Sequence, residues 1–271
     1  MLGKLMKHEF IATWKIFTLL NVIALIAGAV ASLVVANIPD LSQAPEALLV
    51  LLGIGMFGYI FILIAVCILA TVFLVVRYYR SLYSHEGYLT FTLPATTTEI
   101  LSSKILVSFI WMFITAICIL ASLSILSLGV GVLFENCGAY SLGEFYFKAY
   151  SSFAELFGFD HTGVLFAYIA DGLLSICLTL LMFFFAISLG QLWQKHKILG
   201  SIIFYFIIRF VFGISNTIAS FGNGSFQLLY DTGSSEFFVH YLWISIILST
   251  IFSIIMYVGC IFVTDRRLNL D

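Results

Sequence analysis

The stretch ALLVLLGIGMFGYIFILIAVCILATVFLVV, residues 47–76, decides the class of fold. It runs for thirty residues without a single Asp, Glu, Lys or Arg. An α-helix needs about 20 apolar residues to cross roughly 30 Å of bilayer hydrocarbon. The apolar run is continuous rather than alternating, which excludes a strand of a membrane barrel. The stretch therefore predicts a helix that spans a membrane.

Further apolar stretches on both sides repeat this pattern. The six predicted spans are Ile16–Ile38, Ala47–Val76, Ile105–Phe134, Val164–Trp193, Ile198–Ser220 and Phe237–Val263. Of the 271 residues, 62% are hydrophobic and 10% are charged, whereas about a quarter of a typical soluble chain is charged. The second, third and fourth spans would each extend about 45 Å as helices, so we expect them to tilt or to project from the bilayer. We predict an all-α polytopic membrane protein in which residues 1–271 form a single six-span domain.

Basic residues gather on one side of this predicted topology. Lys148 falls on the other side and Arg209 falls within a span, but ten of the twelve share the side of the N-terminus: Lys4, Lys7, Lys15, Arg77, Arg80, Lys104, Lys195, Lys197, Arg266 and Arg267. Carboxylates dominate the opposite side: Asp40, Glu46, Glu135, Glu144, Glu155, Asp160, Asp231 and Glu236. Basic residues near the ends of spans favour the cytoplasmic side. Both termini are therefore predicted to be cytoplasmic.

The first fifteen residues, MLGKLMKHEFIATWK, have the periodicity of a basic amphipathic helix. Glu9 interrupts its apolar face and Ile11 its basic face. Such a helix lies in the headgroup plane of a membrane; the alternative is an ordinary basic flank that only sets the topology. Because these residues precede the first span and include Glu9, we expect that span to be retained rather than cleaved as a signal peptide.

A polar segment, SHEGYLTFTLPATTTEILSSKIL at residues 84–106, separates the second span from the third. Gly87 interrupts the helix and Pro94 ends it. Thr96 and Glu99 then have the spacing of a capping box, which predicts the start of the next helix. Apolar side chains in this cytoplasmic segment would be exposed unless they fold back onto the membrane or meet a cytoplasmic partner; these side chains are Tyr83, Tyr88, Leu89, Phe91 and Leu93.

The order of these features resembles the permease subunits of ABC-2 type transporters found in Firmicutes. The resemblance covers the whole chain in topology, and the sequence match is concentrated in residues 77–104, with the block EGYLTFTLP at Glu86–Pro94. It implies an elbow helix at residues 2–15 and a coupling helix within residues 78–92 that fits a groove on an ATPase subunit. The coupling residues implied by this match are Tyr83, His85, Glu86, Gly87, Tyr88, Leu89, Phe91 and Pro94.

The resemblance also implies how such a chain works. In the bacterial plasma membrane, two permease copies, or this chain and a paralogue, pair above two ATPases that drive alternating access. The sequence has no G-x-x-x-x-G-K-[ST] phosphate-binding loop. We therefore expect no cofactor in this chain, with ATP and Mg bound by the partner ATPase. Membrane lipid is the other expected partner and nucleic acid is not; no residue selects among peptide, lipid, polysaccharide or drug as cargo.

Polar and small residues within the spans give two further candidate sites. Asp171 and Arg209 both lie about 10–15 Å below the outer surface when counted along their spans, which predicts an intramembrane charge pair. The pair either lines a translocation path or fixes the helix register, or else Arg209 snorkels outward. In the first span, Ala24, Gly28 and Ser32 recur at four-residue spacing and form a candidate subunit interface.

The outer loop, residues 135–163, is rich in aromatic residues and carries acidic groups between them. This composition suits an interfacial helix on the outer leaflet. Such a helix either anchors the loop on the membrane surface or binds a peptide or lipid that leaves the transporter.

These residues bear on three classes of function. An enzyme is disfavoured because the sequence has no H-E-x-x-H and no G-x-S-x-G motif, and because the histidines lie at flanks or loops on both sides of the membrane: His8, His85, His161, His196 and His240. The absence of a C-x-x-C pair likewise predicts no metal site. The main hypothesis is a permease subunit of an ATP-driven exporter. The alternative is a substrate-capture, immunity or sensor protein that binds a peptide or small molecule without driving transport.

Overall fold

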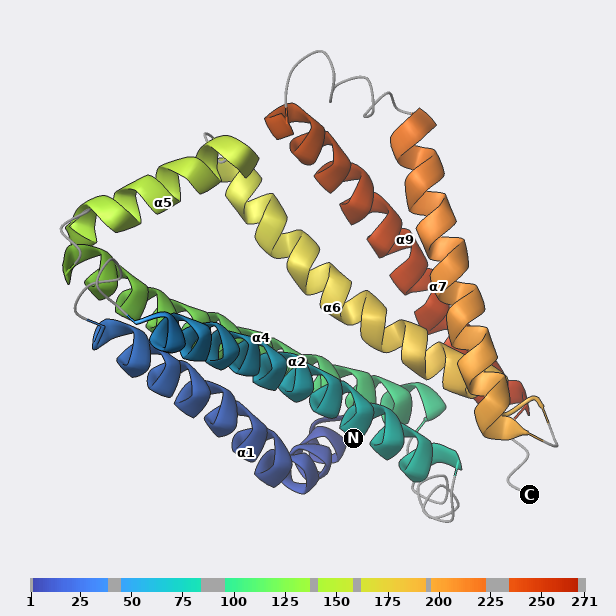
Figure 1. The fold of residues 1–271 in the computed structure, drawn as a ribbon. Helices are drawn as coiled ribbons and strands as arrows, with labels where there is room; N and C mark the ends of the chain where they lie inside the picture. The colour runs from blue at the N-terminus through green and yellow to red at the C-terminus, as the bar shows by residue number, and fades with distance from the viewer. Residues whose placement is uncertain are drawn as a thin grey trace. The chain divides into compact units, whose positions relative to one another are not determined.

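The structure of the protein is a computed structural model that describes residues 2–38, 45–83, 96–136, 141–157, 162–193, 196–222 and 234–267. The described residues are helical apart from short connections. The helices are α1 Leu2–Ala36, α2 Glu46–Tyr83, α4 Thr97–Asn136, α5 Leu142–Phe157, α6 Thr162–Gly190, α7 Lys197–Gly222 and α9 Ser234–Arg267 (Figure 1). Six of these helices, all except α5, are long and apolar enough to cross a membrane. The chain is therefore a multi-pass membrane protein, and the six predicted apolar helices are confirmed.

The helices are longer than the predicted spans. α2 has 38 residues and α4 has 40, so each extends well beyond the roughly 30 Å of a hydrocarbon core or tilts within it. α1 runs without a break from Leu2 to Ala36, so residues 2–15 are continuous with the first span. Of the implied coupling helix, residues 78–83 form the end of α2, and residues 84–92 lie outside the described residues.

A capping box begins α4, as the sequence predicts. The Glu99 amide donates to Thr96 Oγ1 at 3.3 Å, and the Thr96 amide donates to the Glu99 carboxylate at 3.2 Å. Together these bonds satisfy two of the backbone donors that a helix start leaves free. The third predicted span therefore has a defined first turn.

The segment predicted to be an outer loop, residues 135–163, contains an additional helix, α5. A second capping box begins it, in which the Ser141 amide donates to Glu144 at 3.0 Å and the Glu144 amide donates to Ser141 Oγ at 3.4 Å. The hydrogen bond from the Ser141 amide lowers the pKa of Glu144, because it stabilises the ionised carboxylate. Phe145 stacks on Phe134 of α4 with ring centroids 5.3 Å apart, which attaches the start of α5 to the end of α4.

Packing divides the chain, predicted as one six-span domain, into two compact units. The first unit consists of residues 1–10, 73–110 and 154–271, and the second of residues 11–72 and 111–153. The first unit contains α6, α7 and α9, which pack on one another (Figure 1), together with the end of α2 and the start of α4. The second unit contains most of α1, α2, α4 and α5.

Aromatic and glycine contacts set the register of the three-helix bundle in the first unit. Phe183 of α6 stacks on Tyr205 of α7 with ring centroids 4.3 Å apart. Closer to the α6–α7 connection, a Cβ on Gly190 would lie 2.6 Å from the Ser201 backbone nitrogen. Residue numbers rise along α6 as they fall along α7, so these two helices are antiparallel. Gly190 leaves room for the α7 backbone to approach closely at Ser201.

In the second unit, the small-residue stripe packs α1 against α4 of the same chain. Ala24 is fully buried, and its carbonyl accepts a hydrogen bond from Ser122 Oγ at 2.8 Å. A Cβ on Gly28 would lie 2.8 Å from the Ser122 carbonyl oxygen, and a Cβ on Gly129 of α4 would lie 2.8 Å from the Ser32 Cα. The prediction of Ala24, Gly28 and Ser32 as a subunit interface is therefore corrected, because these residues are already occupied by α4.

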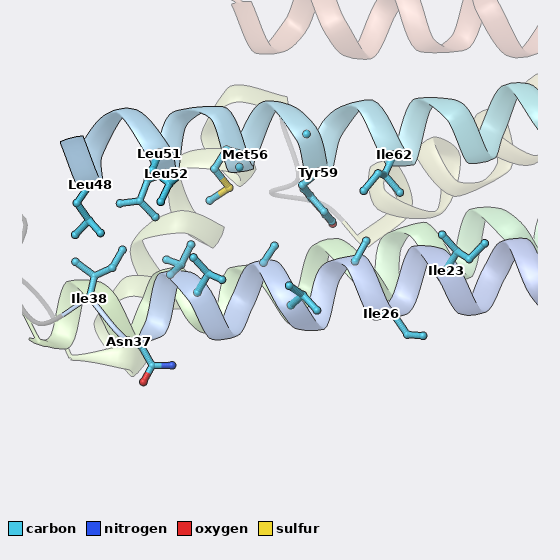
Figure 2. Close-up of a pocket in the computed structure, with 17 residues that line it drawn as sticks. Ile23, Ile26, Asn37, Ile38, Leu48, Leu51, Leu52, Met56, Tyr59 and Ile62 are labelled. Carbon is cyan, nitrogen blue, oxygen red and sulfur yellow. The ribbon is translucent and has the colours of Figure 1, made fainter. Parts of the chain in front are cut away.

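α1 and α2 also form the walls of an apolar groove of about 660 Å³ in the second unit (Figure 2). Seventeen residues line it, and only Asn37 and Tyr59 among them are polar. Asn37 Nδ2 donates to the Leu33 carbonyl at 2.7 Å, and the Tyr59 hydroxyl is hydrogen-bonded to Ser122 at 3.0 Å. With these groups engaged inside the chain, the groove presents a hydrocarbon-like lining.

Candidate functional site

Glu9 of α1 joins α2 and α4 at the ends that flank residues 84–95. Arg77 donates to Glu9 Oε2 from Nε at 2.9 Å and from Nη2 at 2.7 Å, and Lys104 Nζ donates to Glu9 Oε1 at 2.5 Å. The Lys104 side chain is only 8% exposed, that of Glu9 18% and that of Arg77 30%. One carboxylate thus holds two cations on two different helices, all within the first unit.

Two tyrosines attach the last turns of α2 to α6 and α9. Tyr78 stacks on Phe184 of α6 with ring centroids 4.1 Å apart. The Tyr83 hydroxyl donates to Ser188 Oγ of α6 at 2.8 Å and lies 3.5 Å from Thr264 Oγ1 of α9. Tyr83, which the sequence predicted as a coupling residue, therefore anchors the end of α2 in the helix bundle.

The first turns of α4 are attached to α9 in the same way. Thr97 Oγ1 donates to the Asp265 carboxylate at 3.2 Å. One turn further along, the hydroxyls of Ser102 and Tyr257 are 2.8 Å apart. Because Ser102 donates its own proton to the Thr98 carbonyl at 2.6 Å, the Tyr257 hydroxyl is the donor to Ser102. α9 therefore contacts both helix ends that flank residues 84–95.

We call this group the connection base and define it as Glu9, Arg77, Tyr83, Thr97 and Lys104. The structure brings these residues together in the first unit. The other predicted coupling residues lie outside the described residues: His85, Glu86, Gly87, Tyr88, Leu89, Phe91 and Pro94. The described part of the candidate site is thus limited to the helix ends on either side of residues 84–95.

Asp171 and Arg209 do not form the ion pair that the sequence predicted. The Arg209 guanidinium lies 6.0 Å from the ring centroid of Phe212 on its own helix, and the described residues show no ion pair between Arg209 and Asp171 of α6. The register explains the correction. With Phe183 opposite Tyr205 and Gly190 opposite Ser201, Arg209 lies opposite residues 179–182, about 12 Å or more along α6 from Asp171.

Sequence reasoning missed the central residue of the connection base, Glu9. It treated this carboxylate as an interruption of an apolar helix face, and it counted Lys104 only among the basic residues that share the side of the N-terminus. A usable signal was present, because an acidic residue on an apolar face is costly unless a cation meets it. Arg77 and Lys104 were predicted on the same side of the membrane as Glu9.

The remaining chemistry of the described residues is limited. No three His, Cys, Asp or Glu side chains in the described part of the chain lie close enough together to hold a metal ion. The thiols of Cys67, Cys118, Cys177 and Cys260 are free.

In comparisons with known proteins, no family model, no curated protein and no solved structure matches the chain.

Proposed function

We propose that the chain is the membrane-spanning permease subunit of an ATP-driven ABC exporter, and that a separate ATPase docks on residues 77–104. Two features support this proposal. The first is the resemblance of residues 77–104 to the first cytoplasmic loop of ABC-2 type permeases. The second is the connection base, which attaches both ends of the proposed docking segment to the spanning helices.

The observation that carries the proposal is the bridge that Glu9 makes between Arg77 and Lys104. Coupling between distant sites travels through contiguous networks of packed side chains and ion pairs. A displacement of residues 84–95 would pass through α2 and α4 together, because Glu9 joins them, and through Tyr83 and Thr97 to α9. Such a base suits a segment that receives force from a partner.

The proposal also states which side of the membrane the termini face and which protein binds ATP. Both termini and residues 84–95 face the cytoplasm of a bacterium, as the distribution of basic residues favours. ATP and Mg bind to the partner ATPase, and this chain supplies the path but no catalytic group. A second permease copy or a paralogue completes the transporter, through a surface other than Ala24, Gly28 and Ser32, which α4 covers.

Replacing residues 86–93 with eight Gly/Ser residues is the experiment that tests the proposal. We expect the variant to insert normally but to lose the ATPase subunit that co-purifies with the unaltered chain from its native membrane, because the docking side chains are gone. The matched control replaces residues 223–230, also eight residues, in the connection between α7 and α9. This control is expected to retain the ATPase.

Two outcomes would count against the proposal. If the residue 86–93 variant retains its ATPase and still moves cargo, residues 86–93 are not the docking site. If no ATPase accompanies the unaltered chain, the permease assignment fails, and the alternative of a substrate-capture, immunity or sensor protein becomes the better explanation.

A further inference from the structure

One exposed face of α7 carries a charge within an apolar surface. A hollow of about 760 Å³ lies against this helix, and its lining runs from Phe206 to Ile218. All eight lining residues belong to α7 and are exposed, with Phe206 at 66% and Phe210 at 68%. Arg209 is the one charged residue among them. We call these eight lining residues the arginine face.

Arg209 has no counter-charge within the chain. It lies at the midpoint of the predicted span Ile198–Ser220, about 16 Å from either end. Among the described residues, its contact is the Phe212 ring at 6.0 Å, and no hydrogen bond or ion pair reaches the guanidinium. Asp171, the one acidic residue in the six predicted spans, is about 12 Å or more away along the helix axis. A charge at this depth is costly unless a polar partner meets it.

The shape of the arginine face suits a second helix better than a small anion or a lipid headgroup. The face extends about 18 Å along α7. Gly213 lies in it one turn from Arg209, and nothing is within 4 Å of a Cβ there, so another helix can approach closely. The Thr217 hydroxyl donates to the Gly213 carbonyl at 2.9 Å, which leaves the guanidinium as the donor that the face offers. Lipid phosphates lie beyond about 15 Å of hydrocarbon on either side.

A second copy of the chain does not supply the counter-charge. Copies inserted with the same topology have every residue at the same depth, so a symmetric contact through the arginine face would place Arg209 beside Arg209. Such a contact between like charges is unfavourable. Asp171 of a second copy would be offset from Arg209 by the same distance of about 12 Å, and its Oδ1 atom is buried. The counter-charge therefore has to come from a different chain.

We propose that the arginine face binds a spanning helix of a second, non-identical membrane protein, and that Arg209 pairs with an Asp or Glu at the middle of that helix. A guanidinium and a carboxylate form two parallel N–H···O bonds. Phe206 and Phe210 pack along the partner helix, and Gly213 lets it approach. The inference depends on the chain spanning a membrane and not on an ATPase docking on residues 77–104. Within the proposed transporter, such a partner is a paralogue rather than a second copy.

Binding of synthetic helices to the labelled chain in phosphatidylcholine liposomes, followed by fluorescence energy transfer, tests the proposal. The probe is a Leu/Ala peptide of about 25 residues with a single Glu at its middle, and the matched peptide has Gln there. We expect the Glu peptide to bind about tenfold more tightly. A third peptide, with its Glu moved about eight residues from the middle, is offset by about 12 Å and should lose this preference.

Three variants assign the preference to the arginine face. Arg209→Gln is expected to bind the Glu and Gln peptides equally, because the cation is gone. Arg209→Lys should keep part of the preference, since an ammonium retains the charge without the bidentate geometry. Arg80→Gln is the matched control, because Arg80 is an exposed arginine in the last turn of α2, and its preference for the Glu peptide should equal that of the unaltered chain.

Four results would overturn the proposal. The first is equal binding of the Glu and Gln peptides to the unaltered chain, and the second is a preference that persists in Arg209→Gln. The third is loss of the preference when phosphatidylglycerol is added, which would identify a lipid phosphate as the occupant. The fourth is efficient disulfide cross-linking between copies of a Gly213→Cys variant whose native cysteines have been replaced by serine, which would identify a second copy. The peptide assay contains no ATPase, so its failure leaves the docking proposal to the co-purification experiment.

Discussion

Glu9→Gln is expected to lower the free energy of unfolding by about 3 kcal/mol, because removing one member of a partly buried ion network leaves the others uncompensated. Lys104 is the more affected partner, since its side chain is 8% exposed against 30% for Arg77. Gln keeps the shape of Glu, so the loss of stability measures the effect of the removed charge rather than a change in packing. The measurement is reversible unfolding of the purified chain in mixed micelles, followed by circular dichroism.

Glu46→Gln is the control for this prediction, since Glu46 is an exposed residue in the first turn of α2, where a change of about 0.5 kcal/mol or less is expected. A cycle with Glu9→Gln and Lys104→Met should show a coupling of about 1–3 kcal/mol. The same cycle with Asp171→Asn and Arg209→Gln should be additive within about 0.5 kcal/mol, because those side chains form no pair. An additive Glu9 cycle would show that the ion network contributes nothing.

Gly28→Ala is expected to lower the free energy of unfolding by about 2–3 kcal/mol, an effect of overpacking. The new methyl group would lie 2.8 Å from the Ser122 carbonyl oxygen and 3.1 Å from the Ser122 Cα. Both atoms belong to the α4 backbone, so relief requires α1 and α4 to separate. The hydrogen bond from Ser122 to the Ala24 carbonyl would then be strained as well. The same unfolding assay measures the change.

Gly53→Ala is the matched control, because Gly53 lies inside α2, seven residues after its first residue, and nothing lies within 4 Å of a Cβ there. That substitution should stabilise the chain by about 0.5–1 kcal/mol through helix propensity alone. If Gly28→Ala leaves stability unchanged but abolishes self-association, the stripe would be a subunit interface after all, and its packing against α4 would be wrong.

Local signals in the sequence were sufficient to predict the helices. The backbone N–H and C=O groups of an apolar run such as residues 47–76 have to bond to one another within that segment, because a bilayer offers them no other hydrogen-bond partners. The capping box of Thr96 and Glu99 is equally local, since both partners lie within one turn. These features depend on neighbouring residues only, which is why the sequence predicts them.

Features that depend on register or on partners far away in sequence were harder to predict. Asp171 and Arg209 were paired by counting depth from opposite ends of two spans, but the stacking of Phe183 on Tyr205 sets the actual register. The stripe at Gly28 indicates that another backbone approaches closely, without indicating whether that backbone belongs to the same chain. Pairing of Glu9 with Lys104 likewise joins residues that no local pattern connects.

The proposed function requires the connection base to face the cytoplasm, where an ATPase can reach residues 84–95. The most direct measurement is maleimide labelling of a His85→Cys variant in which the native cysteines have been replaced by serine. We predict that a membrane-impermeant maleimide leaves this cysteine unmodified in intact cells and labels it once the membrane is permeabilised. Labelling from outside intact cells would place the segment on the wrong side of the membrane and contradict the proposed function.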